Sequence, residues 1–215
     1  FEVPMPAVRR DRTSRYRVLC DGREVASGRI ERAPQPVQTL ADYVDTRIGT
    51  AHSRWMIAPG PWMPFGMVKL SPDNQNAGWQ AGYQPSFETI GCFSHIHEWT
   101  LGGLGLMATN GDLKVRVGDE RNPDEGYRSR IDKRTEQAGI GCYAADLIDY
   151  GIHAEVTATT RCGFGRFTFP TDRGEGRVLI ELHPQAEYDF ELRDVSVRQV
   201  GDRRIEGSCH QYSPG

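Results

Sequence analysis

Short alternating segments, separated by turn residues at intervals of roughly 8 to 15 residues, most limit how this chain can fold. Residues 151–160 show the pattern best, with Ile152, Ala154, Val156 and Ala158 expected to point inward. Further strands are predicted for residues 67–70, 112–117, 141–147, 161–169 and 177–182. The nearest approach to a helix, residues 130–137, is short and polar all round. The pattern predicts an all-β fold, an antiparallel β-sandwich.

Two of these segments carry more specific expectations. Leu113, Val115 and Val117 alternate with polar residues, which predicts a strand with one buried face. Residues 177–182 are apolar on both sides, which suits a central strand.

Two hairpins and a linker indicate the domain organisation. Asp21-Gly22 stands between two alternating runs, a strong hairpin signal because a tight primed turn needs positive φ. Gly201-Asp202 marks a second hairpin, within residues 195–206. Prolines keep residues 31–38 extended, as in a linker. We therefore expect the end of an accessory β domain in residues 1–38 and a β-sandwich domain in residues 39–215. Both termini are abrupt, so a piece of a longer protein is expected, with the sandwich incomplete at its C-terminus.

Composition excludes several classes of function. The formal net charge is -3 and the basic residues are scattered, which argues against a nucleic-acid partner. No apolar run approaches the roughly 20 residues of a membrane span. The five cysteines include no CxxC pair, which argues against a structural zinc site. Two alternatives remain open for the cysteines: one or two disulfides, or mostly buried free thiols.

Residues 59–66 predict a rigid, irregular surface loop, because three prolines and two glycines fall within eight positions. Trp55, Trp62 and Phe65 in and beside this loop would be costly to leave in water. Something is therefore expected to cover them or to bind to them.

Ser94, His95 and His97 form the first candidate binding group. On a strand, the spacing of the two histidines puts both rings on one face, close enough to share a ligand or a metal. A metal would need a third ligand, for which His52 and His153 are unplaced candidates. Contact with a sugar, metal binding and a buried structural role all remain open at this point.

Trp79, Trp99 and Asp73 complete the candidate site. Either indole could stack on the apolar face of a sugar ring, although a tryptophan also commonly caps a sandwich edge. Asp73 ends a Ser-Pro-Asp turn and could simply cap it. The other carboxylates cannot be paired from sequence. No GxSxG elbow is present, and the glycines of residues 102–105 lack the lysine of a phosphate-binding loop.

Several motifs together resemble the N-terminal domain of glycoside hydrolase family 92, the calcium-dependent exo-α-mannosidases. VDTRIGT at residues 44–50 and PG…PFGMVKLSPD at residues 59–73 match its opening segments. A GW and GY pair, CFSHIH at residues 92–97, and residues 150–170 follow in the family's order. The resemblance extends over residues 42–206.

The resemblance implies a galactose mutarotase-like sandwich that forms one wall of the active-site pocket. The family's (α/α) barrel, absent from these residues, would carry the acid, the base and the calcium ligands, so no catalytic or metal-binding residue is expected here. It also implies a mannose-containing glycan as substrate, and sugar contacts from Trp79 and residues 94–97. The segment Glu98-Trp99-Thr100 departs from the family's small residues at this point, which puts the linkage, and mannose itself, in question.

Three functions therefore compete. The first is the pocket-forming part of a secreted or periplasmic, inverting α-mannosidase that is inactive without its barrel. The second is a non-catalytic carbohydrate-binding β-sandwich module, and the third a structural sandwich without a ligand.

Overall fold

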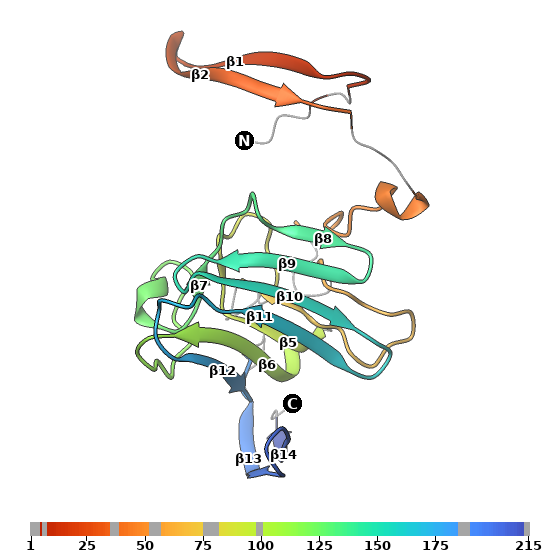
Figure 1. The fold of residues 1–215 in the computed structure, drawn as a ribbon, viewed down its shortest axis with the longest axis vertical. Helices are drawn as coiled ribbons and strands as arrows, with labels where there is room; N and C mark the ends of the chain where they lie inside the picture. The colour runs from red at the N-terminus through yellow and green to blue at the C-terminus, as the bar shows by residue number, and fades with distance from the viewer. Residues whose placement is uncertain are drawn as a thin grey trace. The chain divides into compact units, whose positions relative to one another are not determined.

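The computed structural model describes residues 5, 8–34, 39–51, 57–74, 82–97, 101–184 and 190–212 (Figure 1). The described residues are mostly β-strands and loops, with two short 3₁₀ turns, η1 (Leu40–Tyr43) and η3 (Pro123–Glu125). The chain forms two compact units, Phe1–Tyr43 and Val44–Gly215. No helix in the described ranges is long and apolar enough to cross a membrane.

The first unit contains the hairpin predicted at Asp21-Gly22. Its strands β1 (Arg12–Cys20) and β2 (Arg23–Arg32) pair antiparallel. Asp21 and Gly22 have φ angles of 49° and 78°, the left-handed conformation that a two-residue primed turn requires. The hairpin prediction is confirmed, with β1 starting earlier than the alternation suggested.

The second unit is built on two four-stranded antiparallel sheets. The first sheet has the order β12 (Gly176–Glu181), β6 (Leu101–Asn110), β5 (Cys92–His97), β3 (Ser71–Asp73). The second has the order β11 (Gly163–Thr168), β10 (Ile152–Ala158), β9 (Cys142–Leu147), β8 (Gln137–Gly139). Two smaller pairs join β4 (Thr89–Ile90) to β7 (Ser129–Arg130) and β13 (Glu191–Gln199) to β14 (Ile205–Tyr212). The antiparallel β-sandwich is confirmed.

Aromatic side chains fill the space between the two large sheets. The ring of Phe93 on β5 lies 6.3 Å from that of Tyr143 on β9 and 6.2 Å from that of Phe167 on β11. Ile152, Ala154 and Val156 on β10 are buried in the same core, as the alternation predicted. The core therefore sits where inward-facing side chains of both sheets meet.

Three strand predictions were wrong in whole or in part. Residues 112–117 form no strand, and Val115 is 81% exposed. The segment is a loop in which the carbonyls of Arg116 and Val117 accept from the N–H groups of Tyr127 and Arg128. β12 is an edge strand rather than a central one, which leaves Val178 and Ile180 about half exposed. Of residues 67–70, only Lys69 makes a β-bridge, to Trp62, and the strand begins at Ser71.

Buried carboxylates are satisfied by tyrosine hydroxyls. Glu136 accepts hydrogen bonds from Tyr83 (2.8 Å) and Tyr143 (2.7 Å) and pairs with Lys133 (3.1 Å). Burial is the main cause that raises the pKa of both tyrosines, and the adjacent carboxylate adds to it.

A second pair of tyrosines, Tyr127 and Tyr150, contacts β12 through Glu181. The Tyr127 hydroxyl donates to Glu181 (2.6 Å), and the Tyr150 hydroxyl donates to the carbonyl of Tyr127 (2.9 Å). Burial raises the pKa of Tyr127. Burial also raises the pKa of Tyr150, to about 12.

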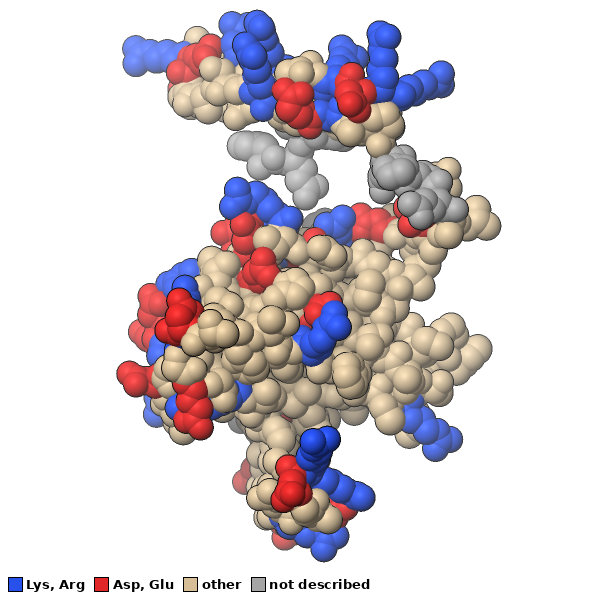
Figure 2. All heavy atoms as spheres, in the orientation of Figure 1, with Lys and Arg blue, Asp and Glu red and all other residues tan. Residues whose placement is uncertain are grey.

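All five cysteines are free thiols, so no disulfide is formed. Only Cys92 is buried, and its Sγ donates to Asp73 Oδ2 at 3.2 Å. On the visible surface, Lys and Arg side chains are interspersed with Asp and Glu (Figure 2).

Candidate saccharide-binding site

Asp73 on β3 and His97 on β5 are in contact within the first sheet. β3 pairs with β5 so that Asp73 lies opposite Cys92 and Ser71 opposite Ser94. His97 Nε2 lies 2.8 Å from Asp73 Oδ1, and both side chains are buried. The two residues are 24 positions apart in the chain, so this contact depends on the pairing of the strands.

The other side-chain polar atoms of Asp73, Ser94 and His97 also lie within reach of partners inside the protein. His97 Nδ1 lies 2.6 Å from the Lys69 carbonyl, and Ser94 Oγ lies 3.4 Å from His97 Nε2. Asp73 Oδ2 accepts from Cys92. Asp73, Ser94 and His97 were expected to touch sugar. In this structure their side chains link β3 to β5, and their contact with a sugar stays a prediction.

His95 occupies a different environment. Its Nδ1 lies 2.7 Å from the carbonyl of Leu104, and the ring is half-buried. A β-bulge in β6 makes this possible, because Gly103 and Leu104 together oppose His95, with Gly103 at φ 71°. A Cβ at Gly163 would come within 2.7 Å of His95 Nε2, so the ring lies directly over that glycine of β11. Burial lowers the pKa of His95, and the bond to Leu104 opposes this.

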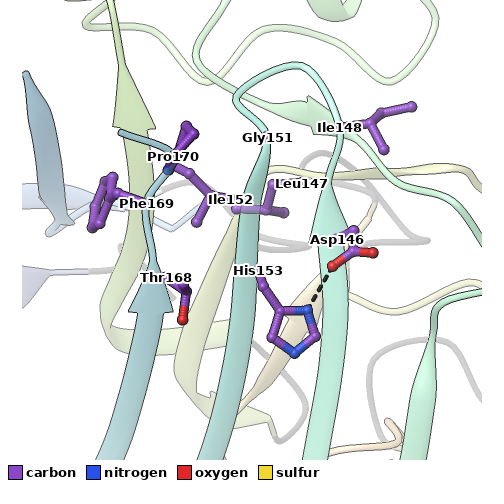
Figure 3. Close-up of a pocket in the computed structure, with 9 residues that line it drawn as sticks. All are labelled: Asp146, Leu147, Ile148, Gly151, Ile152, His153, Thr168, Phe169 and Pro170. Carbon is purple, nitrogen blue, oxygen red and sulfur yellow. Dashed lines mark hydrogen bonds and ion pairs between the residues drawn. The ribbon is translucent and has the colours of Figure 1, made fainter. Parts of the chain in front are cut away.

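The ring nitrogens of the two histidines therefore lie against different partners. His153 has its own partner, Asp146, at 2.5 Å, in a pocket of about 460 Å³ at the β9–β10 turn (Figure 3). None of the predicted sugar-contacting residues lines that pocket. Across the described part of the chain, no three His, Cys, Asp or Glu side chains come together as a metal site. His52 lies outside the described residues.

Trp62 forms one side of the Asp73–His97 cluster. Its ring lies 6.1 Å from that of His97, and Lys69 Nζ lies 5.4 Å from the indole centroid. The indole is half-buried, and within the described residues its buried Nε1 has no hydrogen-bond partner. The loop of residues 59–66 is irregular, as predicted, and brings one of its aromatic rings into the cluster. Trp55 lies outside the described residues.

Asn74 forms hydrogen bonds that connect the two ends of the segment of residues 75–81. Its N–H donates to the Gly82 carbonyl (3.0 Å), and its Oδ1 accepts from the Gln84 N–H (3.0 Å). Its Nδ2 donates to the carbonyl of Thr89. Gly82 has a φ of 102°, a conformation that favours glycine. Residues 75–81, which include Trp79, therefore begin and end at one hydrogen-bonded base.

A buried arginine supports this base. Arg128 Nη1 donates to the Asn74 carbonyl and to Thr89 Oγ1, both at 2.8 Å, and the side chain is fully buried. Burial lowers the pKa of Arg128. Sequence reasoning missed both Arg128 and Asn74, because neither a charged residue in a polar segment nor an asparagine after a turn signals burial.

The segments that carry the two predicted tryptophans start from one place. Trp79 and Trp99 lie outside the described residues, but the positions before their segments are described. Residues 98–100 connect β5 to β6 immediately after His97, and residues 75–81 start two positions after Asp73. The Asp73–His97 contact thus joins the starting points of both segments.

Comparison of the chain with known proteins identifies its family. Residues 43–215 match the model of the glycosyl hydrolase family 92 N-terminal domain. An uncharacterized secreted glycosidase of Arthroderma benhamiae is 28% identical over 151 residues, which are 65% of this chain and 19% of that protein. The structure is similar to that of the family GH92 α-mannosidase BT3965 of Bacteroides thetaiotaomicron, solved with mannoimidazole. The TM-score is 0.70 with 30% identity, over 79% of this chain and 23% of the other.

A more distant structure shares the fold. The family GH92 inverting mannosidase BT2199 of Bacteroides thetaiotaomicron aligns with a TM-score of 0.53 and 19% identity, over 67% of this chain and 20% of the other. The chain spans less than a quarter of the length of each of these three relatives. The match to the family model covers most of the chain, and the chain therefore belongs to glycosyl hydrolase family 92, whose N-terminal domain it contains.

Proposed function

We propose that this chain forms one wall of the substrate pocket in an exo-acting, inverting α-mannosidase that hydrolyses terminal α-mannosidic linkages of glycans. One observation carries the proposal: the buried Asp73–His97 contact fixes the common origin of the two segments that bear Trp79 and Trp99. A flat, weakly hydrated indole is the kind of surface on which a pyranose stacks. Membership of the family, and the name of its relative BT3965, support mannose as the sugar.

The candidate residues divide into two roles in this proposal. Trp79, Trp99 and the half-exposed His95 contact the sugar. Asp73, Ser94 and His97 act on the sugar only through the segments that they hold, because their polar atoms bond inside the protein.

The reactive groups lie elsewhere in this proposal. Hydrolysis with inversion needs a carboxylic acid at the leaving oxygen and a carboxylate that activates water on the other side of the sugar. Bound calcium would polarise oxygen ligands and orient that water. The described residues assemble no site for such an ion. We therefore assign the calcium ligands, the acid and the base to a C-terminal (α/α) barrel of the complete enzyme. Of the secreted and periplasmic locations, the name of the Arthroderma relative supports the secreted one.

Hydrolysis of an aryl α-mannoside tests this assignment. We expect the complete protein to turn over the substrate with calcium present, to lose activity on chelation, and to release the β-anomer first, as NMR would show. The isolated chain of 215 residues should give no turnover. Turnover by the isolated chain would place the carboxylates within it. Mannoside binding without hydrolysis by the complete protein would support the alternative of a carbohydrate-binding module.

A further inference from the structure

The loop of residues 59–66 ends in a tight, well-braced turn, here called the Phe65 tip (residues 63–67). The Gly66 N–H donates to the Met63 carbonyl at 2.9 Å, and the Met67 N–H donates to the Thr160 carbonyl at 2.7 Å. An antiparallel β-bridge between Trp62 and Lys69 joins the two chain segments that flank the turn. Its backbone is therefore fixed before any partner arrives.

Phe65 is unusual in both conformation and exposure. Its φ is 57°, in the left-handed region, which is a genuine outlier for a bulky side chain. Its ring is fully exposed, at 102% relative accessibility, so no packing within the described part of the chain compensates for the strain. Met63 and Met67 beside it are 44% and 69% exposed. Asparagine or glycine would fit the turn better, so folding of this chain does not explain a phenylalanine here.

The chemistry of the tip favours a protein partner over a sugar. Residues 63–67 read Met-Pro-Phe-Gly-Met and carry no polar side chain. A bound sugar needs hydrogen bonds to its hydroxyls as well as an aromatic face, and the tip offers only the second. Aromatic residues and methionine are enriched at protein interfaces, and a stiff loop loses little entropy when it docks.

We propose that the Phe65 tip is a docking element that inserts into an apolar pocket on the remaining polypeptide of the complete enzyme. The choice of partner rests on the proposed function, and on the finding that this chain spans less than a quarter of its relatives. The tip would fix the wall described above against the part of the enzyme that carries the reactive groups.

Photo-crosslinking in the complete protein tests the contact directly. With p-benzoylphenylalanine in place of Phe65, we expect an intramolecular crosslink to a peptide outside residues 1–215. The same group at Val25, an exposed position on β2, serves as the control and should give no crosslink to that peptide. A crosslink only within residues 1–215, only between two copies, only to added mannan, or none at all would overturn the proposal. The readout needs no activity, so a failure of the mannosidase assignment is seen separately.

Two substitutions test whether the ring itself matters. Phe65→Asn suits the left-handed backbone but removes the ring, so the Tm of the complete protein should fall by about 2–4 °C. Phe65→Met, which keeps an apolar side chain, should recover part of that loss. Asp21→Asn, at an exposed left-handed position with a φ of 49°, is the matched control and should leave Tm unchanged. A rise in Tm for Phe65→Asn would show that only strain was relieved, and would contradict docking.

Discussion

Replacing Arg128 by methionine is expected to lower the free energy of unfolding by about 3 kcal/mol, measured by urea denaturation. The guanidinium donates at 2.8 Å to both the Asn74 carbonyl and Thr89 Oγ1. Methionine fills similar space but leaves both acceptors buried without this donor. Release of the desolvation cost of the buried charge offsets part of the loss, so the net effect is smaller than two full charged hydrogen bonds.

Two further variants make the Arg128 result interpretable. Arg128→Lys keeps the charge but not the planar fork, and should lose about half as much stability. Arg116→Met changes an exposed arginine in the neighbouring loop and should stay within about 0.5 kcal/mol of the parent. If Arg128→Met were neutral or stabilising, the desolvation cost would outweigh the bonds. Arg128 would then not support the base of residues 75–81.

Alkaline pH is expected to unfold the protein steeply. Burial is the main cause that raises the pKa of four tyrosines above the usual value of about 10: Tyr83, Tyr127, Tyr143 and Tyr150. Below about pH 10 both the folded and the unfolded states keep these protons. Above it the unfolded state releases them while the folded state does not, so stability falls as the pH rises. Between pH 10 and 11 each tyrosine contributes a loss of about 1 kcal/mol, or about 4 kcal/mol for the four together, and the slope approaches about 1.4 kcal/mol per pH unit for each tyrosine at higher pH.

Urea midpoints at about pH 9, 10 and 11, with a reductant present, would measure this slope. Cys92 begins the decline earlier, near pH 8.5, because burial also raises the pKa of its thiol. Tyr143→Phe removes one titrating group and should reduce the loss of stability between pH 10 and 11 by about 1 kcal/mol. A urea midpoint that stayed constant over this range would mean that the hydroxyls are not held protonated by the fold.

Local signals predicted much of the fold from sequence. Asp21-Gly22 specified its hairpin because only a few residues tolerate the left-handed conformation of that turn. The alternation in residues 151–160 correctly predicted the inward face of β10. Residues 112–117 alternate just as clearly but form no strand. Whether an alternating segment becomes a strand depends on a neighbouring strand to pair with, and the segment's own sequence does not show whether one is present. The apolar sequence of β12 likewise could not show that this strand lies at the sheet edge, because the order of strands depends on how the other strands pair.

The candidate site was only partly predictable. The motifs identified Asp73 and His97, but they gave no sign that the two side chains, 24 positions apart, would be in contact in the folded sheet. His95 and His97 share a strand without sharing a partner, because a bulge in the neighbouring strand gives His95 the Leu104 carbonyl. The burial of Arg128 depends on how distant segments pack, for which a single sequence contains no signal.

Trp79→Ala in the complete protein tests the central claim, that this chain supplies a wall of the mannose pocket. Loss of a stacking surface should lower kcat/KM for an aryl α-mannoside by roughly 30-fold, equivalent to about 2 kcal/mol. Trp62→Ala is the contrasting control, because its half-buried ring packs beside His97 and Lys69 and should mainly affect Tm.

We predict that Trp79→Ala weakens mannoside turnover and binding while Tm changes by less than about 2 °C. A large fall in Tm with unchanged kinetics would contradict the account, since Trp79 would then only cap the sandwich.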